Sequence, residues 1–578
     1  TVNLKHDSAL KHVTGKSVYV NDITTHRQLV GRVVYSPVAH ARISLLDTKS
    51  ALKLNGVAGI LTSKDIPGEN QMGPAIHDEP CLAEEKVTFI GQAIALIAAE
   101  TEEAALAAEK LIRIEFEELE RILTLQDAIK KDSLIAPVRT IECGNVEDVF
   151  KSAPHVISGE LETGAQEHWY LETQSALAIP GEGKEMLIHA SSQNPAETQA
   201  IVAEVLGVSK NEIEVEVRRM GGGFGGKETQ GNHVAAWAAL LANATRRPVG
   251  IHLFRDDDQK ITGKRHRFLS NYKIAFNDDG KILAYSVDLN SDAGATTDLS
   301  RAILERAMLH AENTYYIPNV KIVGKACKTN LPSNTAFRGF GGPQGMAVIE
   351  TAIDRMARYL KKEASEIRKL NFYGFNDRNI TPYGETISNN HLHVMYDQLL
   401  ASSGYANRRH EIEKFNQDHE FVKRGIALTP VKFGISFTTA FLNQAGALVH
   451  IYTDGTIAVN HGGTEMGQGL NTKIHGIASA EFGVSPDFIK VSVTNTSKVP
   501  NTSATAASSG SDLNGMAVKN AIGKLKLRLA DVAVEMLKTK LTIDSITADQ
   551  IIFAENYIFT TSHPEEKIAF GELVNKAY

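Results

Sequence analysis

The segment Arg218–Glu228, which reads R-R-M-G-G-G-F-G-G-K-E, constrains the fold of this chain more than any other stretch. Five of the six residues from Gly221 to Gly226 are glycine. Holding so many glycines in one conformation is costly in backbone entropy. A folded chain tolerates this where the main chain takes positive φ or lies very close to another group. The segment therefore predicts a loop whose backbone N–H groups can cradle an anion or a polar cofactor.

A strand pattern and a helix pattern flank this loop. Apolar residues alternate with glutamates over 213–217, which indicates a half-buried strand. Residues 233–244 are rich in alanine and carry larger apolar residues at helical spacing. The sequence thus predicts a strand, then the glycine loop with Lys227 and Glu228 at its rim, then a helix.

Two nucleotide-binding fingerprints match the loop only in part. Gly221, Gly223 and Gly226 fit G-x-G-x-x-G, but the acidic residue expected about 20 residues later to hold a ribose is missing. The loop also fits most of a phosphate-binding P-loop, but Glu228 occupies the position of the Ser or Thr that binds Mg²⁺. A turn without chemical function is the plain alternative for a lone Gly-x-Gly, and the number of glycines here favours a binding loop.

Composition and charge argue against several classes of protein. The chain has 61 Lys and Arg against 68 Asp and Glu, a net charge of −7, which does not favour nucleic-acid binding. Cys81, Cys143 and Cys327 are isolated, so we predict neither a disulfide scaffold nor a zinc or iron–sulfur site built from this chain. Thr1–Leu10 is polar, and no run approaches the roughly 18 apolar residues of a membrane span. These features predict a cytoplasmic protein.

The length of 578 residues predicts several domains. We place them at residues 1–135, 136–380 and 381–578, with the polar segment Asn376–Glu385 at the second boundary. In the first domain, Thr101 can cap a helix that extends to about Lys110 between two strands. This β-α-β arrangement has no evident catalytic side chain and is predicted to be scaffold.

A second polar corner precedes the glycine loop in the chain. Met186–Ala190 predicts a strand, and Asn194 at the N-cap, Pro195 at N1 and Glu197 at N3 predict a helix start. Gln193 lies at this corner, so two successive strand ends present polar groups, which is how α/β folds build sites. The alternative for Gln193 is an amide bonded to its own backbone.

A second glycine loop, Thr335–Gln344, reads T-A-F-R-G-F-G-G-P-Q and precedes a predicted helix over Gly345–Leu360. Arg338 in such a loop favours an anion ligand. Phe340 can stack on a flat ring.

Two basic features carry less information. Arg306 lies on a predicted helix over Leu304–Met308 and would by itself be assigned to the surface. A basic cluster is predicted to be a solvated loop rather than a binding patch; its members are Lys260, Lys264, Arg265 and Arg267.

Two further loops of small residues precede predicted helices. A hairpin around Asp454-Gly455 leads to Gly462–Gly469, and a helix is predicted from about Thr472. Val499–Ser509 precedes another helix, and a flexible linker is its alternative. Four such loops at strand-to-helix junctions predict one large polar cofactor held mainly by the backbone.

These motifs, in this order, resemble those of the molybdenum-binding subunits of xanthine dehydrogenases in the xanthine oxidase family. The bacterial arrangement, with a separate molybdenum-binding subunit, is the most similar. The resemblance covers the whole chain. The motifs that carry it are GAQEHWYLE at Gly164–Glu172, SSQN at Ser191–Asn194, RRMGGGFGGKE at Arg218–Glu228, NTAFRGFGGPQG at Asn334–Gly345, FGISFT at Phe433–Thr438 and GGTEMGQGL at Gly462–Leu470.

The resemblance implies an α/β and α+β fold. A hammerhead-like α/β domain over 1–135 would precede a first molybdenum-cofactor-binding domain over 136–380 and an incomplete second one over 381–578. It also implies a molybdenum–molybdopterin cofactor whose metal is held by the pterin dithiolene. The residues with cofactor roles by motif are Gln193, Gly223, Phe224, Gly225, Arg338, Gln468, Ala506, Ala507 and Ser508. Among them Gln193, Phe224 and Arg338 would lie nearest the metal.

The resemblance further implies hydroxylation of hypoxanthine and xanthine to urate with oxygen from water. Phe340 and Phe437 resemble the two rings that sandwich the purine, and Thr438 resembles a backbone contact beside it. Glu228 resembles the glutamate that hydrogen-bonds the purine. Arg306 resembles the arginine that stabilises negative charge building on the purine. The catalytic candidates are therefore Arg306, Glu228 and Gln193.

Electron transfer in the family implies partners. Two [2Fe–2S] clusters and FAD would carry electrons to NAD⁺, and this chain has no binding motif for either carrier. The resemblance therefore implies an iron–sulfur and FAD subunit or domain, in a heterotetramer or higher oligomer.

One element of the family pattern is absent from the 578 residues. The family's general base is a glutamate in a G-E-P-P-type motif near the C-terminus, and the sequence reaches Tyr578 before any such motif. We therefore expect the last domain to lack its closing elements and to expose apolar surface. The alternatives are an aldehyde or N-heterocycle oxidase of the same family, or a catalytically inactive fragment or assembly module.

Overall fold

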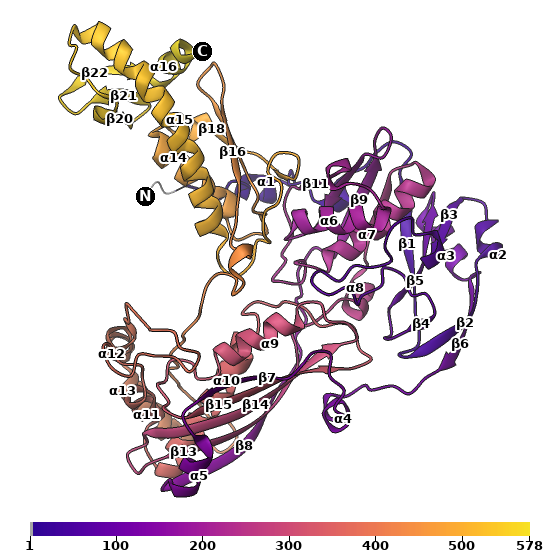
Figure 1. Ribbon diagram of the computed structural model, residues 1–578, viewed down its shortest axis with the longest axis vertical. Coiled ribbons are helices and arrows are strands. Elements are labelled where there is room, and N and C mark those ends of the chain that lie inside the picture. Colours follow the sequence, from indigo (N-terminus) through magenta and orange to yellow (C-terminus); the bar gives the residue numbers. More distant parts are fainter. Residues whose placement is uncertain (1–3) are drawn as a thin grey trace. The chain divides into compact units, whose positions relative to one another are not determined.

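The computed structural model describes residues 4–578, so the first three residues of the polar N-terminal stretch lie outside it (Figure 1). The chain forms two compact units. The first unit comprises Thr1–Glu120, His168–Gly263 and Ile435–Tyr578, and the second comprises Arg121–Glu167 and Lys264–Gly434. Each unit is therefore assembled from segments that are far apart in the sequence.

The first unit is built on an eight-stranded mixed sheet. In spatial order its strands are β19 (Thr494–Asn495), β11 (Ile213–Val217), β10 (Met186–Ala190), β9 (Ser175–Pro180), β12 (Val249–His252), β1 (Leu29–Tyr35), β5 (Ala93–Ala99) and β3 (Val57–Thr62). The helices α6 (Pro195–Leu206) and α7 (Gly231–Thr245) pack on one face. The short helices α2 (Lys49–Leu52) and α3 (Glu102–Glu109) pack on the other face. Successive residues of β5 point to opposite faces and are buried on both, which explains its continuous apolar sequence.

Several predicted elements are confirmed in this unit. The strands β10 and β11 have the predicted bounds, and α7 contains the predicted 233–244 helix. Asn194 caps α6 by accepting a hydrogen bond from the N–H of Glu197, and Pro195 occupies the first turn. Thr101 caps α3 through the N–H of Ala104. Local capping chemistry therefore decided where these helices begin.

The predicted β-α-β arrangement at the N-terminus is wrong as a single-sheet unit. The two strands flanking α3 belong to different sheets: β5 lies in the large sheet, and β6 (Arg113–Glu118) pairs with β2 (Ala41–Asp47), which also pairs with β4 (Lys86–Val87). The reason is the burial each strand needs. All seven residues of β5 are buried, whereas β6 alternates charged and apolar residues and suits a half-exposed sheet.

The C-terminal part of the first unit has its own hydrophobic core. It contains a sheet of β16 (Ala447–Ile451), β17 (Ile457–His461) and β18 (Ile489–Val491), and a meander of β20 (Ile551–Ala554), β21 (Tyr557–Thr560) and β22 (His563–Ala569). Helices α14 (Leu470–Phe482), α15 (Gly510–Leu541) and α16 (Phe570–Ala577) pack against them. The predicted hairpin at Asp454-Gly455 is present, with Gly455 at a φ of 85°. On α15, Met516 and Leu527 are exposed.

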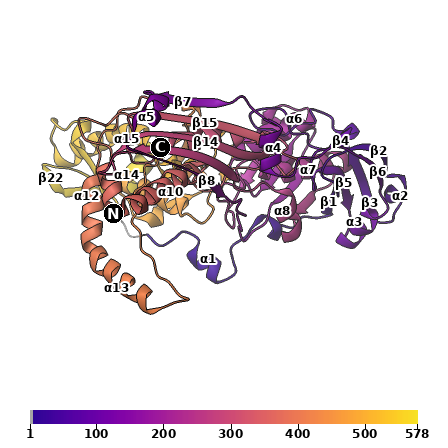
Figure 2. The same cartoon turned by 90° about the horizontal axis from the view of Figure 1, so that it is seen from below.

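The second unit is a five-stranded sheet in the order β7 (Arg139–Cys143), β15 (Val320–Lys328), β14 (Ile282–Gly294), β13 (Phe268–Phe276) and β8 (His155–Thr163). Helices α9 (Ser300–Leu309) and α10 (Gly342–Leu360) cover one face. Figure 2 shows α10 beside the strands β14 and β15. The helices α4 (Leu125–Lys130) and α5 (Val146–Ser152) pack on the opposite face. The unit also contains α11 (Ala364–Leu370), α12 (Leu392–Ser402) and α13 (Tyr405–Asp418). Within residues 4–578, the remaining α-helices are α1 (Ala9–Val13) and α8 (Arg255–Ile261), both in the first unit.

Two glycines let α10 begin directly against the backbone of α9. A Cβ at position 341 would lie 2.1 Å from the carbonyl oxygen of Ile303, and one at position 345 would lie 2.1 Å from that of Ala307. Contacts this short are impossible for a side chain, so only glycine allows the approach. This G-x-x-x-G pair therefore fixes the loop before α10 against the helix that carries Arg306.

None of the helices formed by residues 4–578 combines the length and apolarity that crossing a membrane requires.

Buried histidines predict a stability that depends on pH. Burial lowers the pKa of His266 to about 3 and that of His461 to about 4, against 6.5 for an exposed histidine. Between pH 6.5 and 4 the unfolded chain therefore binds more protons than the folded chain, and the free energy of unfolding falls as the pH is lowered through this range. Each histidine contributes at most about 1.4 kcal/mol for every unit by which folding lowers its pKa.

Urea unfolding followed between about pH 6.5 and 5 tests this expectation, because carboxylates titrate mainly below that interval. The stability should fall with acidification, and His461→Gln should reduce the slope. A stability that is flat or rises on acidification would contradict the prediction.

Candidate functional site

Gln193 connects three loops of the first unit. Its side-chain Oε1 accepts a hydrogen bond from the N–H of Gly225 at 2.9 Å, and its Nε2 donates to the carbonyl of Thr505 at 3.2 Å. Its main-chain N–H donates to Lys227, and its carbonyl accepts from the N–H of Thr505. Because both ends of the amide contact other loops, the alternative of an amide bonded to its own backbone is wrong.

The glycine loop needs its glycines for two physical reasons. Gly222 and Gly225 have φ of 95° and 100°, a region that side chains rarely adopt. Gly223 has no room for a side chain, since a Cβ there would lie 2.6 Å from Gln193 Oε1. Phe224, at the tip, also has a positive φ of 54° and is exposed. The loop is thus held in one conformation by packing and by backbone geometry together.

A single carboxylate oxygen holds both ends of this loop. Glu172 Oε2 accepts from the N–H of Gly221 at 2.8 Å and from Lys227 Nζ at 3.1 Å, and Ser191 Oγ donates to the same oxygen at 2.9 Å. Lys227 also donates to the main-chain carbonyl of Glu172 and lies 4.6 Å from the ring centroid of Tyr170. We call the contacts of Glu172 with Gly221 and Lys227 the loop clasp.

The prediction that Lys227 and Glu228 lie at the rim of the loop is wrong. The Lys227 side chain is 0% exposed, and Glu228 is 6% exposed. Burial lowers the pKa of Lys227, and the neighbouring Glu172 carboxylate opposes that shift. The lysine does not face solvent because it is the cationic half of the clasp.

Several main-chain N–H groups in these loops have no acceptor within residues 4–578. They belong to Gly223 and Phe224 in the glycine loop and to Ala507 and Ser508 in the 499–509 loop. Ala507 and Ser508 are consecutive residues with φ of 54° and 58°, just before α15. Such clustered N–H groups suit an anionic or polar ligand.

The third predicted loop is largely self-bonded. Gln468 Oε1 accepts from the N–H of Met466 at 2.7 Å, and its Nε2 donates to the carbonyl of Thr464 at 2.9 Å. The carboxylate of Glu465 accepts main-chain N–H bonds from Gly467, Gly469 and Asn471, which organise the start of α14. The side chain of Gln468 therefore shapes its own loop.

The segment that carries Phe437 and Thr438 is tied to the 499–509 loop, because the N–H of Ser436 donates to the carbonyl of Ala507 at 2.8 Å. Asn443 fixes Phe437 by accepting from its N–H and donating to its carbonyl. Asn443 was not singled out in the sequence, where it is one amide among many. Phe437 is half-buried and Thr438 is exposed.

In the second unit, Arg306 is 6% exposed, so its assignment to the surface is wrong. Its Nη1 donates to the carbonyl of Gly434 at 2.5 Å, and its guanidinium lies 5.6 Å from the ring centroid of Phe433. Burial lowers the pKa of Arg306, and an arginine still keeps its charge at neutral pH. A buried fixed cation of this kind is suited to stabilising developing negative charge.

The 335–344 loop places Arg338 and Phe340 in the same unit. Phe340 has a positive φ of 49°, and its N–H donates to the carbonyl of Phe337. Arg338 is exposed and lines a cavity of about 440 Å³ together with Phe433.

The prediction of a solvated basic loop at 260–267 is wrong for Arg265. This side chain is buried and stacks on Phe337 at 3.9 Å. It donates to the carbonyl of Arg338 and to Gln166. Arg265 therefore supports the 335–344 loop from beneath. Spacing alone could not separate it from its solvated neighbours.

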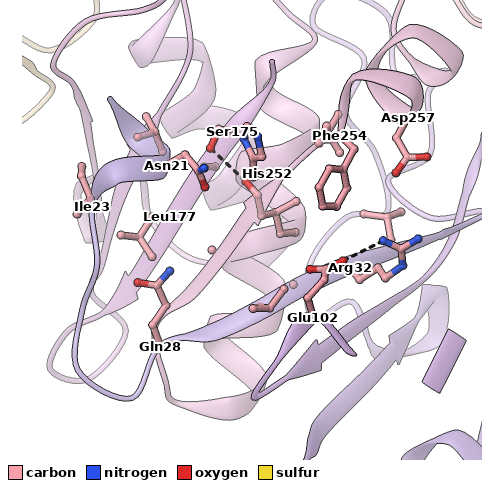
Figure 3. Close-up of a pocket in the computed structure, with 18 of the residues that line it drawn as sticks. Asn21, Ile23, Gln28, Arg32, Glu102, Ser175, Leu177, His252, Phe254 and Asp257 are labelled. Atoms are coloured by element: carbon pink, nitrogen blue, oxygen red, sulfur yellow. Dashed lines mark hydrogen bonds and ion pairs between the residues drawn. The ribbon is translucent and has the colours of Figure 1, made fainter. Parts of the chain in front are cut away.

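A separate cavity of about 340 Å³ in the first unit contains none of the predicted site residues (Figure 3). Arg32 lies at one side of it and pairs with Glu102 at 3.2 Å, with Asp257 nearby. Burial raises the pKa of Asp257, and the neighbouring Asp256 adds to the shift.

Comparison with known families matches three models to consecutive parts of the chain. Residues 14–120 match the a/b hammerhead domain of aldehyde oxidase and xanthine dehydrogenase. Residues 128–372 and 398–578 each match a molybdopterin cofactor-binding domain.

Curated relatives agree with these models. The xanthine dehydrogenase of Dictyostelium discoideum is 47% identical over 532 residues, which is 92% of this chain and 39% of that protein. The xanthine dehydrogenase/oxidase of Gallus gallus is 45% identical over 537 residues, 93% of this chain and 39% of that protein. The chain belongs to the xanthine oxidase family. It corresponds to the molybdenum-binding portion and spans about two fifths of the length of these relatives.

Solved structures share the fold. Quinoline 2-oxidoreductase from Pseudomonas putida 86 superposes with a TM-score of 0.87 at 23% identity, covering 99% of this chain and 75% of that chain. An aldehyde oxidoreductase from Desulfovibrio gigas gives a TM-score of 0.80 at 28% identity, covering 90% and 59%. The predicted fold class, a hammerhead domain followed by molybdenum-cofactor-binding domains, is confirmed. The predicted domain boundaries remain predictions.

The residues of the first unit fit the molybdopterin cofactor that the family models assign. Gly223 lets the loop pack directly on the side chain of Gln193, and the N–H groups of Gly223 and Phe224 have no acceptor in the described chain. Among residues 4–578, the one group of three metal-ligating side chains is His6, Asp7 and Glu465, and the Glu465 carboxylate already accepts three N–H bonds. The donor set thus suits a cofactor that is bound mainly by main-chain N–H groups.

The loop clasp predicts a specific cost of mutation. Glu172→Gln removes the carboxylate that is hydrogen-bonded to the buried ammonium of Lys227, so the free energy of unfolding should fall by about 3–5 kcal/mol. The double variant Glu172→Gln with Lys227→Met removes the buried charge and should recover part of this loss. Chemical denaturation measures both.

Glu182→Gln, at an exposed carboxylate, is the matched control and should change stability by less than about 0.5 kcal/mol. If the single variant Glu172→Gln were as stable as this control, the clasp would not hold the loop.

Proposed function

We propose that this chain carries the cofactor- and purine-binding residues of a molybdenum hydroxylase that converts hypoxanthine and xanthine to urate. The relatives named xanthine dehydrogenase at 45–47% identity support the class of enzyme. One observation carries the purine assignment: the side chains of Glu228 and Arg306 are both buried. By motif, Glu228 matches the family's purine-binding glutamate, and Arg306 matches the arginine that stabilises negative charge on the purine.

We assign cofactor roles to the loop residues of both units. Gln193, Gly223, Phe224 and Gly225 would approach the metal end of the cofactor. Contacts to the pterin and its phosphate are assigned to Arg338, Gln468, Ala506, Ala507 and Ser508. When bound, the molybdenum centre supplies two-electron oxidation of a carbon with oxygen derived from water. The chain's own loops orient that group through N–H donors held rigid by the loop clasp and by Gln193.

We assign substrate roles to five side chains or backbone groups. Phe340 and Phe437 would stack on the purine, and Thr438 would offer a main-chain contact beside it. Glu228 would hydrogen-bond the ring, and Arg306 would stabilise the negative charge that builds on it during attack. In a buried setting this stabilisation is larger than in water because the effective dielectric constant is lower.

Electron acceptors would come from outside this chain. Cys81, Cys143 and Cys327 are isolated free thiols, so we propose that [2Fe–2S] clusters and FAD are carried by partner subunits or domains in a larger oligomer. Glu465 has no role as general base in this proposal, because its carboxylate is engaged by three main-chain N–H groups.

Cofactor binding can be tested without any activity measurement. The purified chain, produced in cells that make the cofactor, should contain molybdenum by elemental analysis. Gly223→Ala should lose it, since the added Cβ would lie 2.6 Å from Gln193 Oε1.

Gly164→Ala is the matched control, because a Cβ there meets no atom within 4 Å. Equal molybdenum content in both variants would count against the cradle. Absence of molybdenum in the wild-type chain would favour an assembly or scaffold role for this polypeptide.

Substrate class is tested in the intact enzyme with its electron-transfer partners. The double change Arg306→Met with Glu228→Val should lower kcat/KM for xanthine by at least about 10²-fold, because it removes charge stabilisation and a purine hydrogen bond. Aldehyde oxidation should persist. Survival of xanthine turnover in the double variant would overturn the purine assignment and favour an aldehyde- or N-heterocycle-oxidising relative.

A further inference from the structure

A short segment of the second unit, Pro430–Gly434, is held by residues at and after the end of α9. We call it the strap. Asn313 Nδ2 donates to the carbonyl of Pro430 at 2.9 Å, and Asn313 Oδ1 accepts from the N–H of Lys432 at 3.0 Å. The ammonium of Lys432 pairs with Glu312, whose side chain is 0% exposed. These contacts therefore fix Pro430 and Lys432, which precede the last residue of the strap.

The last residue of the strap, Gly434, is held on both sides of its backbone. Its carbonyl accepts from Arg306 Nη1 at 2.5 Å, and its N–H donates to His310 Nε2 at 3.3 Å. Arg306 and His310 are four residues apart on α9 and its C-cap, so they lie one above the other on the same face. Both hydrogen bonds to Gly434 thus come from one turn of one helix.

The partners of His310 dictate its tautomer. Its Nδ1 lies 2.7 Å from the carbonyl of Arg306, which can only accept, so Nδ1 carries the proton. Its Nε2 faces the N–H of Gly434, which can only donate, so Nε2 carries the lone pair. His310 must therefore be neutral to make both contacts.

The surroundings keep His310 neutral. Burial lowers its pKa to about 4, and the cations Lys432 and Arg306 oppose its protonation further. The ring of Phe433 packs beside it, with ring centroids 5.2 Å apart. The acceptor at Nε2 is thus retained across the neutral pH range.

We propose that His310 is a positioning residue that fixes the guanidinium of Arg306 through Gly434 and thereby sets the preference of the enzyme for purines. The chain of contacts is closed: Arg306 O to His310 Nδ1, His310 Nε2 to Gly434 N–H, and Gly434 O to Arg306 Nη1. Without the histidine, Gly434 loses one of its two contacts with α9, and the arginine loses a fixed acceptor. This inference rests on the proposed purine hydroxylation.

The structural arm of the test needs no activity. In the full chain with isotope-labelled histidine, nitrogen NMR should show His310 as the neutral Nδ1–H tautomer down to about pH 5. The assignment comes from the loss of that signal in His310→Gln. An Nε2–H tautomer, or a charged ring at neutral pH, would overturn the closed set of contacts.

The kinetic arm compares substrates in the holoenzyme, with rates normalised to molybdenum content. His310→Phe keeps a ring but removes both hydrogen bonds, so kcat/KM for xanthine should fall by up to about 10²-fold through misplacement of Arg306. The rate for an aldehyde, which does not depend on that charge, should change little. His310→Gln, which retains a donor and an acceptor, should recover part of the xanthine rate.

The control is His391→Phe, at an exposed histidine of the same unit, which should leave both rates unchanged. An equal loss for both substrates in His310→Phe would mean a purely structural role, and no loss for xanthine would mean no role. Either result overturns the inference alone. Absence of xanthine turnover in the wild-type holoenzyme would instead overturn the proposed function.

Discussion

The carboxylate of Glu172 holds both ends of the glycine loop, and the conformation of the loop that we propose to face the cofactor depends on that contact. One oxygen accepts from Gly221 at the start of the loop and from Lys227 at its end. Because the lysine is wholly buried, the pair has no alternative partner in water, and breaking it leaves an isolated charge. The clasp therefore holds the residues between Gly221 and Lys227 in one conformation, in which some main-chain N–H groups have no acceptor within the described chain. Gln193 adds the link from this loop to Thr505.

The candidate ligand-binding groups of the two units differ in kind. In the first unit we propose that the ligand groups are mostly main-chain N–H groups, among them those of Phe224, Ala507 and Ser508, which have positive φ. In the second unit we propose that the chemistry depends on a charged side chain, Arg306, which is buried and held by the carbonyl of Gly434. Main-chain donors suit a large polar cofactor because they are rigid and uncharged. A buried arginine suits a transient negative charge because its field is poorly screened.

Close helix packing explains how the second unit holds its arginine. The G-x-x-x-G pair at Gly341 and Gly345 brings α10 against the backbone of α9, the helix on which Arg306 is buried. The strap then supplies the acceptor at Gly434. The sequence shows the two glycines and the strap more than 80 residues apart, with nothing local to join them. Their cooperation is a property of the folded unit.

Predictions that depended on neighbouring residues were confirmed. Examples are the strands at 186–190 and 213–217, the cap at Asn194 and the hairpin at Asp454-Gly455. Predictions that needed burial or long-range partners were wrong, as for the rim position of Lys227 and the surface assignment of Arg306. The β-α-β unit failed for the same reason, because the sheet to which a strand belongs is decided by distant strands.

The sequence by itself determined that four loops of small residues end strands and begin helices, and its motif order determined the family. Those features are local, since glycine content, caps and alternation act within a few residues. Only the tertiary structure decided that Glu172 clasps the glycine loop, and that His310 and Arg306 both hold the backbone of Gly434. Each of these contacts joins residues that are tens to hundreds of positions apart in the sequence. Whether such residues become buried next to one another is set by the whole fold.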